Sequence, residues 1–328
     1  LMKIAVYDLR EDECASLHAA AKELGCTLVE TDQHLTPETL HLAEGCQGVS
    51  FLGYTRIDAP VLTGLQRMGV TCLGTRIIGY DHIDLACAKE LGLKVCNCKY
   101  GPNGVADFAV MLILVVLRKL KQALQRSQIQ DYELKGLRGR ELKDLTVGVI
   151  GTGWIGSTVV RNLSGFGCRL LAYDLKENPA IRDCAAYVDL DTLYWESDVV
   201  TLHLPLLEST YHMINAESIA KMKPGVVLIN SSRGEMVDTA ALIQGLESGR
   251  IGGVGLDTIE GEQCVLNADH RAGPPPHPQI AYLQQFPNVV LTGHMAFYTD
   301  DAVDAMAGGS LRTLCQLIET GTCPTLLT

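Results

Sequence analysis

Short apolar runs recur along the second half of the chain, and each is followed by a polar or glycine-containing loop and a helix-like segment. Uninterrupted apolar runs are typical of strands buried on both faces, and their alternation with helices predicts a parallel α/β sheet. Six strands are predicted there, over residues 147–150, 170–173, 199–203, 226–230, 253–256 and 289–292. We therefore expect a doubly wound sheet in this part of the chain.

The first hundred residues show shorter elements of the same kind. Residues 12–24 have the spacing of an amphipathic helix, and strand-like runs lie at 3–7, 48–52, 71–73 and 94–96. This alternation resembles a flavodoxin-like α/β unit. A Pro-Asn-Gly sequence at 102–104 is then predicted to begin a long apolar helix that reaches about residue 126.

Two later segments complete the domain prediction. Residues 261–287 contain a Pro-Pro-Pro run and are expected to form an irregular surface loop. The final stretch includes a helix over 299–319 but is too short to fold alone. We therefore expect an α/β protein with two domains, in which a Rossmann doubly wound domain, residues 101–296, is inserted into a discontinuous flavodoxin-like domain, residues 1–100 and 297–328.

The loop after the strand at 147–150 carries the most specific signal in the chain, the sequence Gly151-Thr-Gly153-Trp-Ile-Gly156. Gly151 permits a tight turn, Gly153 lets the backbone approach a pyrophosphate, and Gly156 allows close packing of helix on strand. The helix that follows offers unpaired N–H groups to phosphates. The alternative is a structural glycine turn, but the flanking strand and helix favour a dinucleotide-binding site.

Asp174 selects between the two nicotinamide cofactors. It follows the next predicted strand, where a carboxylate can accept hydrogen bonds from the adenosine ribose hydroxyls and would repel the 2′-phosphate of NADP. A solvated loop Asp is the alternative interpretation. The sequence predicts NAD.

Composition limits the other classes of partner. The chain has 328 residues, a formal net charge of −11 and 47% hydrophobic residues. A phosphate-binding surface needs an excess of Lys and Arg, so we expect no nucleic-acid partner. The longest apolar run, 105–117, contains Asp107 and is too short for a bilayer, and the chain opens without a signal-peptide pattern. We therefore expect no membrane association.

Twelve cysteines are scattered along the chain. In a long chain without a signal peptide, they are expected to be reduced thiols of a cytoplasmic protein. Cys96 and Cys98 lie two residues apart, and no cluster with zinc-ligand spacing accompanies them. We expect packing roles for these thiols and no metal site.

Candidate catalytic residues follow the predicted strands, where ligands bind in open α/β sheets. Arg233 offers a planar fork of donors that suits a carboxylate and could polarise a ketone, although a lone Arg often forms a surface ion pair. His294 could exchange a proton with a substrate oxygen, and Glu262 could fix its tautomer and stabilise the imidazolium. His203 is a rival candidate at another strand end, where we expect it to bond to the backbone instead.

With these residues in place, the chain from about residue 75 to 323 resembles the D-isomer-specific 2-hydroxyacid dehydrogenases. It is most similar to the branch that holds D-lactate dehydrogenase, D-2-hydroxyisocaproate dehydrogenase and the vancomycin-resistance dehydrogenase. The resemblance is carried by the stretches Gly79–Leu85, Tyr100–Ala106, Gly151–Gly156, Leu202–Pro205, Ile229–Gly234, Leu256–Asp257, Glu260–Glu262 and His294–Thr299.

The resemblance implies roles for individual residues. Arg233, Glu262 and His294 correspond to the catalytic set, in which the Arg also binds the substrate carboxylate. Backbone amides of Ile78 and Gly79 are implied at that carboxylate, and Tyr100 and Phe297 beside the substrate side chain, although core packing is an equal alternative for those two rings. Besides the three glycines and Arg233, the implied cofactor contacts are Trp154, Ile155, Asp174, Leu204, Pro205, Thr210, Ser231, Ser232 and Asp257.

Two positions depart from the family pattern. Gly293 stands where relatives usually have Pro before the catalytic His, which removes a restraint on the backbone. Thr210 stands where relatives often have Asn, so one cofactor hydrogen bond is expected to differ.

We therefore expect an NAD-dependent D-2-hydroxyacid dehydrogenase that reduces a 2-oxo monocarboxylic acid, such as pyruvate or a branched or aryl oxoacid, and forms a homodimer. Two alternatives remain open. One is a non-catalytic NADH-sensing module of the same fold, because a fold alone does not establish activity. The other is a dehydrogenase specific for 2-oxoglutarate, which we disfavour because no extra basic residue stands out as a partner for a second carboxylate.

Overall fold

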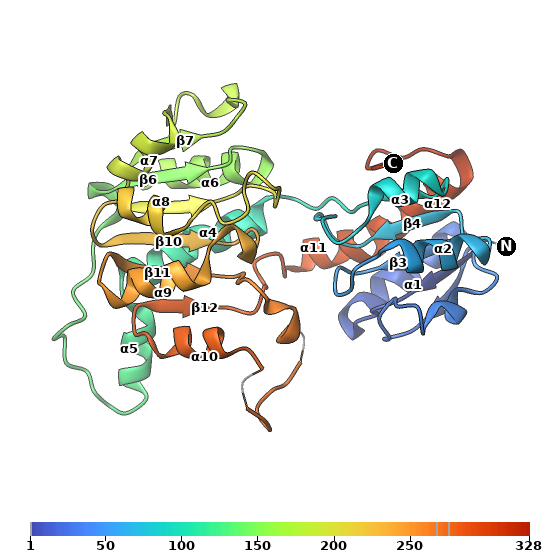
Figure 1. Ribbon diagram of the computed structural model, residues 1–328, viewed down its shortest axis with the longest axis horizontal. Coiled ribbons are helices and arrows are strands. Elements are labelled where there is room, and N and C mark those ends of the chain that lie inside the picture. Colours follow the sequence, from blue (N-terminus) through green and yellow to red (C-terminus); the bar gives the residue numbers. More distant parts are fainter. Residues whose placement is uncertain (1, 267, 275) are drawn as a thin grey trace. The chain divides into compact units, whose positions relative to one another are not determined.

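The computed structural model describes residues 2–266, 268–274 and 276–328. The chain divides into two compact units, each built around its own parallel sheet (Figure 1). Unit 1 comprises Leu1–Gly101 and Tyr298–Thr328, and unit 2 comprises Pro102–Phe297.

The sheet of unit 1 has the strand order β2-β1-β3-β4-β5, with all neighbours parallel. This is the flavodoxin-like order, so the predicted architecture is confirmed. Strand β2 was not predicted because its side chains are only partly buried and form no continuous apolar run. The strands are β1 (Lys3–Val6), β2 (Thr27–Glu30), β3 (Gly48–Phe51), β4 (Cys72–Thr75) and β5 (Lys94–Cys96).

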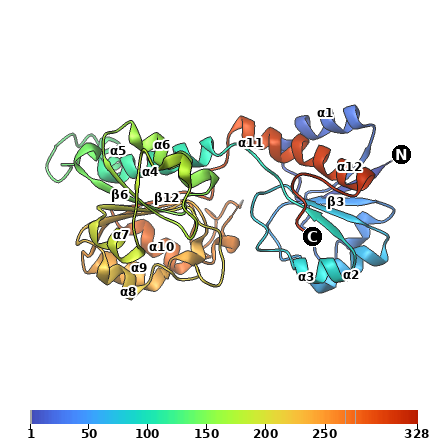
Figure 2. The same cartoon turned by 90° about the horizontal axis from the view of Figure 1, so that it is seen from above.

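Helices cover both faces of this sheet (Figure 2). One face carries α1 (Cys14–Leu24) and α12 (Ser310–Thr320), and the other carries α2 (Ala59–Arg67) and α3 (Leu85–Glu90). Helix α1 begins two residues later than predicted, since the short 3-10 helix η1 (Glu11–Glu13) precedes it, and η2 (Leu40–Ala43) is a second such turn.

The C-terminal segment completes the core of unit 1. Leu311, Leu314 and Leu317 of α12 are fully buried and pack with Ile4 and Val6 of β1. This burial explains why the segment returns to the first unit rather than folding separately. The helix predicted there is divided into α11 (Asp300–Asp304), the π-helical turn η7 (Ala305–Gly309) and α12.

Unit 2 contains a seven-stranded parallel sheet of order β12-β11-β10-β9-β6-β7-β8. The chain direction across the sheet reverses between β6 and β9, and this switch point is where dinucleotides bind in such sheets. All six predicted strands form, and the additional β8 is a two-residue edge strand too short to leave a pattern. The strands are β6 (Thr146–Ile150), β7 (Arg169–Tyr173), β8 (Ala186–Tyr187), β9 (Val199–Leu202), β10 (Val226–Asn230), β11 (Ile251–Leu256) and β12 (Val289–Leu291).

The helices of unit 2 lie on both faces of the sheet, as Figure 2 shows. One layer holds α4 (Asn103–Leu117), α5 (Leu120–Ser127) and α6 (Trp154–Ser164). The other holds α7 (Leu190–Glu196), α8 (Ala216–Lys221), α9 (Thr239–Glu247) and α10 (Pro278–Gln285). Short 3-10 helices are η3 (Leu142–Asp144), η4 (Pro179–Ile181), η5 (Gly234–Met236) and η6 (Glu262–Cys264).

The prediction of one continuous helix to about residue 126 is wrong. Lys119 adopts a left-handed backbone with φ of 53°, which ends α4 and starts α5 in a new direction. The carbonyl of Leu117 then accepts a hydrogen bond from the Arg140 N–H at 3.1 Å instead of continuing the helix.

The prediction of an irregular loop over 261–287 is wrong at both ends, because η6 and α10 lie within it. Helix α10 starts with Pro278 in its first turn, and the His277 ring accepts the N–H of Ile280 at 3.3 Å as an N-cap. Buried Leu283 then anchors the helix to the core. Of the Pro-Pro-Pro run, Pro275 lies outside the described residues.

In the described part of the chain, no helix is both long and apolar enough to cross a bilayer.

Candidate active site

The glycine-rich loop lies at the switch point, between the ends of β6 and β9. Gly151 has φ of +92°, and a side chain there would place its Cβ 2.5 Å from the carbonyl oxygen of His203. A Cβ at Gly156 would collide with the carbonyl of Gly151. Both positions therefore require glycine, since the turn is left-handed at the first and helix and loop touch at the second.

Gly153 is the N-cap of α6 and is not crowded. A Cβ at Gly153 would have no heavy atom of the described residues within 4 Å, so this stretch of backbone faces open space. The first hydrogen bond of the helix runs from Ser157 N–H to the Gly153 carbonyl, so the N–H groups of Trp154, Ile155 and Gly156 precede the helical ladder. Such N–H groups and the helix dipole attract anions.

Asp174 follows β7 and turns its carboxylate back to the glycine loop. One oxygen accepts the Thr152 N–H at 2.6 Å, and the other accepts the Lys176 N–H at 3.2 Å. The carboxylate is therefore held at the end of the strand, beside the loop that a dinucleotide would occupy.

The loop after β9 forms the other side of the switch point. The Thr210 hydroxyl donates to the Pro205 carbonyl at 2.8 Å and accepts the Leu207 N–H at 2.8 Å, which closes the loop into a turn. Thr210 is thus a buried residue that shapes its own loop.

Serines 231 and 232 differ in their bonding. The Ser232 hydroxyl donates to the Leu202 carbonyl at 2.6 Å, which ties the β10 loop to β9. The Ser231 hydroxyl is buried and has no hydrogen-bond partner among the described residues. A buried unpaired hydroxyl at this position is available to a ligand.

Arg233 is positioned by its own loop. The Asn230 side-chain amide donates to the Arg233 carbonyl at 2.7 Å, and the Arg233 guanidinium donates to the Ser232 carbonyl at 2.8 Å. The next residue, Gly234, touches the backbone of the loop after β11, where a Cβ would collide with the peptide that joins Ile259 and Glu260. The Arg233 loop and the loop after β11 are therefore in direct backbone contact.

His294 and Glu262 meet as the sequence suggested. The His294 Nδ1 atom lies 2.7 Å from a carboxylate oxygen of Glu262, and the other oxygen of Glu262 accepts the Ile259 N–H at 2.9 Å. The Glu262 residue is 7% exposed, whereas the His294 side chain is 32% exposed. The imidazole can therefore hold a proton against a buried carboxylate and still present an edge outward.

Asp257 holds the backbone around His294. Its carboxylate accepts the N–H groups of Met295 at 2.9 Å and Ala296 at 2.8 Å, and its backbone carbonyl accepts the N–H of His294 at 2.9 Å. His294 itself has φ of 54°, an uncommon conformation for a residue with a side chain. The buried Asp257 thus stabilises a strained turn, a role that sequence reasoning did not assign to it.

His203 lies in a different environment. Its Nε2 atom is 2.8 Å from the Thr201 hydroxyl, and its Nδ1 atom is buried without a hydrogen-bond partner among the described residues. Burial lowers the pKa of His203 to about 3, so the ring is neutral at physiological pH.

The remaining candidates, which the resemblance implies near the substrate, lie in both units. The Ile78 carbonyl accepts the Asn97 side-chain amide at 2.7 Å, which orients the Ile78–Gly79 peptide. Tyr100 follows β5 and is partly buried. Phe297, in unit 2, packs edge-on against the His294 ring with centroids 6.4 Å apart. The asparagine was missed in the sequence because a single amide carries no pattern.

Comparison with known proteins identifies the family. Residues 110–296 match the family model described as D-isomer specific 2-hydroxyacid dehydrogenase, NAD binding domain. The aromatic 2-oxoacid reductase of Clostridium sporogenes is 42% identical over 324 residues, which is 98% of each chain. The structure of D-2-hydroxyisocaproate dehydrogenase superposes with a TM-score of 0.89 at 35% identity and covers both chains completely.

The chain belongs to the D-isomer-specific 2-hydroxyacid dehydrogenase family. It is an NAD-dependent oxidoreductase, and the predicted resemblance, enzyme class and cofactor are confirmed. A D-isomer-specific 2-hydroxyacid dehydrogenase from Lactobacillus delbrueckii ssp. bulgaricus in its NAD-complexed form superposes with a TM-score of 0.84 at 35% identity, and covers both chains completely.

The residues at the switch point of this dehydrogenase fit NAD. The open Gly153 backbone, the N–H groups of α6, the Asp174 carboxylate and the unpaired Ser231 hydroxyl supply donors and acceptors of the kinds that a pyrophosphate and a diol require. Trp154, at the first position of α6, is 55% exposed.

Proposed function

We propose that this dehydrogenase reduces a 2-oxo monocarboxylic acid to the D-2-hydroxy acid with NADH, and that His294 is the proton donor. The observation that carries the proposal is the 2.7 Å contact between His294 Nδ1 and buried Glu262, which leaves the other ring nitrogen for a substrate oxygen. A carboxylate at Nδ1 favours the imidazolium, which is the form that can donate.

Each remaining group has a proposed task. Bound NADH supplies the hydride equivalent. The Arg233 guanidinium binds the substrate carboxylate with a bidentate fork, and the backbone amides of Ile78 and Gly79 are further carboxylate donors. Glu262 stabilises the imidazolium before the proton leaves Nε2 of His294 for the substrate oxygen.

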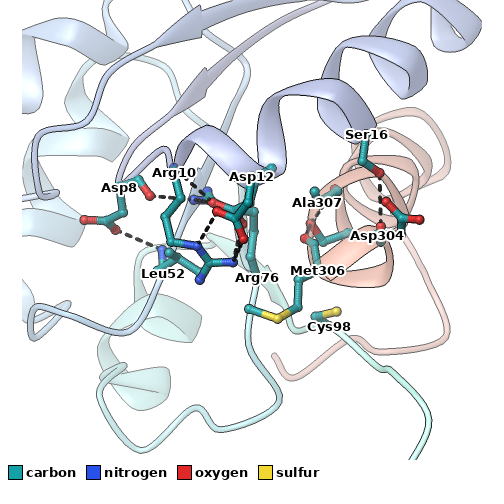
Figure 3. Close-up of polar contacts among 12 residues, drawn as sticks. Asp8, Arg10, Asp12, Ser16, Leu52, Arg76, Cys98, Asp304, Met306 and Ala307 are labelled. Atoms are coloured by element: carbon teal, nitrogen blue, oxygen red, sulfur yellow. Dashed lines mark hydrogen bonds and ion pairs between the residues drawn. The ribbon is translucent and has the colours of Figure 1, made fainter. Parts of the chain in front are cut away.

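The arginines near the strand ends of unit 1 are paired with acidic side chains (Figure 3). Arg10 is paired with Asp12 at 3.0 Å, and fully buried Arg76 is paired with Glu13 at 2.9 Å. With Asp8 nearby, three carboxylates accompany these two guanidiniums. Both guanidiniums therefore already have carboxylate partners, and neither is proposed as the partner of a second substrate carboxylate.

The side chain of the substrate is proposed to be branched or aromatic and uncharged. Tyr100 and Phe297 are the rings implied beside it, and both are only partly buried, so each retains surface for a ligand. The similarity to an aromatic 2-oxoacid reductase supports the same choice.

A panel of 2-oxoacids tests the function directly. NADH oxidation should be fastest with phenylpyruvate or 4-methyl-2-oxopentanoate and much slower with 2-oxoglutarate, and the product should be the D isomer. Preference for 2-oxoglutarate would contradict the substrate class. Tight NADH binding without turnover of any 2-oxoacid would instead favour the sensing module.

Two variants of the purified protein test the binding groups. Arg233→Lys should lose both substrate binding and turnover, because an ammonium cannot reproduce the bidentate fork although the charge is kept. Asp174→Ala should narrow the preference for NADH over NADPH, since the repelling carboxylate is gone. Near-normal efficiency of the first variant, or equal use of both cofactors by wild type, would refute the respective assignment.

We further propose that the enzyme is a homodimer. An apolar groove beside α4 includes Met111 of α4, Leu120 of α5 and Phe166 just after α6, which are 42%, 42% and 41% exposed. An apolar patch of this kind is typical of a subunit interface. Light scattering should report a dimer, and Met111→Asp should weaken it; a monomeric wild type would exclude this arrangement.

A cytoplasmic location is proposed from the thiols. All twelve cysteines are free and none forms a disulfide, which suits a reducing compartment. Fractionation of the source cells tests this.

A further inference from the structure

The Glu260 carboxylate joins three segments of unit 2. One of its oxygens lies 2.7 Å from Nε2 of His212 and accepts the Tyr211 hydroxyl at 3.5 Å, and the other accepts the Thr239 hydroxyl at 3.4 Å. His212 lies in the loop between β9 and α8, and Thr239 begins α9. Glu260 itself precedes Glu262 by two residues, in the segment after β11.

His212 is fixed by more than this ion pair. Its backbone has φ of 48°, its N–H donates to the Glu235 carbonyl at 2.9 Å, and its ring stacks on Tyr211 with centroids 4.1 Å apart. A left-handed backbone at a residue with a side chain persists only where surrounding contacts hold it. The imidazole therefore approaches Glu260 in one defined orientation.

The backbone on the other side of the pair is equally constrained. The His277 Nδ1 atom accepts the Ile280 N–H, so its proton resides on Nε2, which donates to the Glu260 carbonyl at 3.0 Å. Gly234, next to Arg233, touches the Ile259–Glu260 peptide so closely that no side chain fits between them. The Glu260 segment thus lies against the Arg233 loop and leads directly into Glu262.

We propose that His212 and Glu260 are positioning residues that tie the cofactor loop, residues 204–210, to the segment that carries Glu262. The proposal rests on the proposed function, in which Leu204, Pro205 and Thr210 contact NADH and Glu262 supports His294. The contact holds His212, two residues after the cofactor loop, against Glu260, two residues before Glu262. Without the pair, the cofactor loop gains freedom that NADH binding must then remove.

A fully exposed ion pair would restrict the cofactor loop much less than the contact between His212 and Glu260. The His212 and Glu260 side chains are 29% and 30% exposed, so solvent screens the charge only partly. The two residues are 48 positions apart and connect loops rather than turns of one helix. Loss of the contact is therefore expected to make the two loops more mobile and to lower the affinity for NADH.

Two variants remove the pair with little change elsewhere. Glu260→Gln keeps the shape and removes the charge. His212→Asn shortens the side chain so that it no longer reaches Glu260, while Asn is among the residues that best tolerate a left-handed backbone. Glu247→Gln is the matched control, because Glu247 accepts the Tyr282 hydroxyl at 2.7 Å between α9 and α10 and touches neither loop.

The affinity for NADH, measured by cofactor fluorescence with the full chain, should fall roughly threefold to tenfold in either variant and by no more in the double variant. The KM for NADH should rise with it, while kcat at saturating NADH should fall less. Amide hydrogen exchange across residues 204–212 should accelerate in the absence of cofactor. Glu247→Gln should match wild type in every measurement.

Wild-type NADH affinity and unchanged exchange in Glu260→Gln would overturn the tie, as would an equal loss in Glu247→Gln. Additive losses in the double variant would show that the two residues act separately, which also contradicts it. Because affinity and exchange need no turnover, these outcomes remain distinct from a failure of the proposed reaction, which would appear as an inactive wild type.

Discussion

Two strand ends of the same sheet each present a histidine, and the two histidines differ in almost every physical respect. His203 follows β9, bonds to the Thr201 hydroxyl and has a pKa lowered to about 3 by burial. His294 follows β12, contacts the buried Glu262 carboxylate and has a side chain that is 32% exposed. Of these two rings, His294 alone combines a negative partner with access to a ligand.

The difference shows that a strand-end position does not by itself suffice for acid chemistry. A neutral ring without a carboxylate partner cannot donate a proton at physiological pH. A histidine that acts as an acid needs a negatively charged partner that stabilises its imidazolium form. It also needs one edge of the ring to remain accessible to a ligand. The following variants break or sharpen this contrast.

The largest effect is expected for His294→Ala. Loss of a positioned proton donor should reduce the rate of 2-oxoacid reduction by on the order of 10²- to 10⁴-fold. The comparison variant His203→Gln should keep its rate within about tenfold of wild type. Single-turnover kinetics with deuterated NADH would show whether hydride transfer limits the rate, and unchanged turnover of His294→Ala under that condition would move His203 into the catalytic role.

Glu262→Gln should lower the rate of 2-oxoacid reduction by an amount that depends on pH. The amide keeps a hydrogen-bonding group at 2.7 Å from His294 but removes the charge that favours the imidazolium. Reduction at pH 7.5 should fall by roughly tenfold or more, because the proton donor loses its negative partner. Activity should recover as the pH is lowered. A pH profile superimposable on that of wild type would remove Glu262 from the mechanism.

His203→Gln should change the acid stability of the protein rather than its chemistry. Because the folded pKa of about 3 lies below the ordinary value of 6.5, the unfolded state binds a proton that the folded state does not as the pH falls from 6.5 to 3. Wild type therefore loses stability in this window, by roughly 1–2 kcal/mol at pH 5 from this group.

The measurement for this variant is urea unfolding as a function of pH. The difference in unfolding free energy between His203→Gln and wild type should be constant above pH 7. Below pH 6.5 the variant should become more stable relative to wild type. A difference independent of pH would mean that His203 is not buried in its neutral form.

The smallest effect is expected for Gly293→Pro, next to His294. Gly293 has no positive φ, and a Cβ there would meet no described heavy atom within 4 Å. Proline should therefore be tolerated and stabilise the protein by up to ~1 kcal/mol through the unfolded state. Thermal unfolding and activity assays test this, and a misfolded or inactive variant would show that the turn before His294 cannot adopt the proline backbone.

Much of the site could be predicted because its signals are local. Gly151, Gly156 and Asp174 lie within one strand-helix-strand unit, where spacing along the chain fixes geometry. Arg233 and His294 could be placed at strand ends because strand ends are visible as the ends of apolar runs. The break at Lys119 and helix α10 were missed, since a left-handed residue and a side-chain cap depend on particular contacts.

By itself the sequence determined the family, the two parallel sheets, the cofactor and the set of strand ends from which the site is built, because periodicity and glycine spacing are properties of consecutive residues. The sequence also suggested that Glu262 meets His294, whereas only the tertiary structure decided that Glu260 meets His212 and that the His203 ring is buried. Glu262 reaches His294 across 32 residues, and Glu260 reaches His212 across 48. Burial and long-range partners come from segments distant in the chain and leave no local pattern.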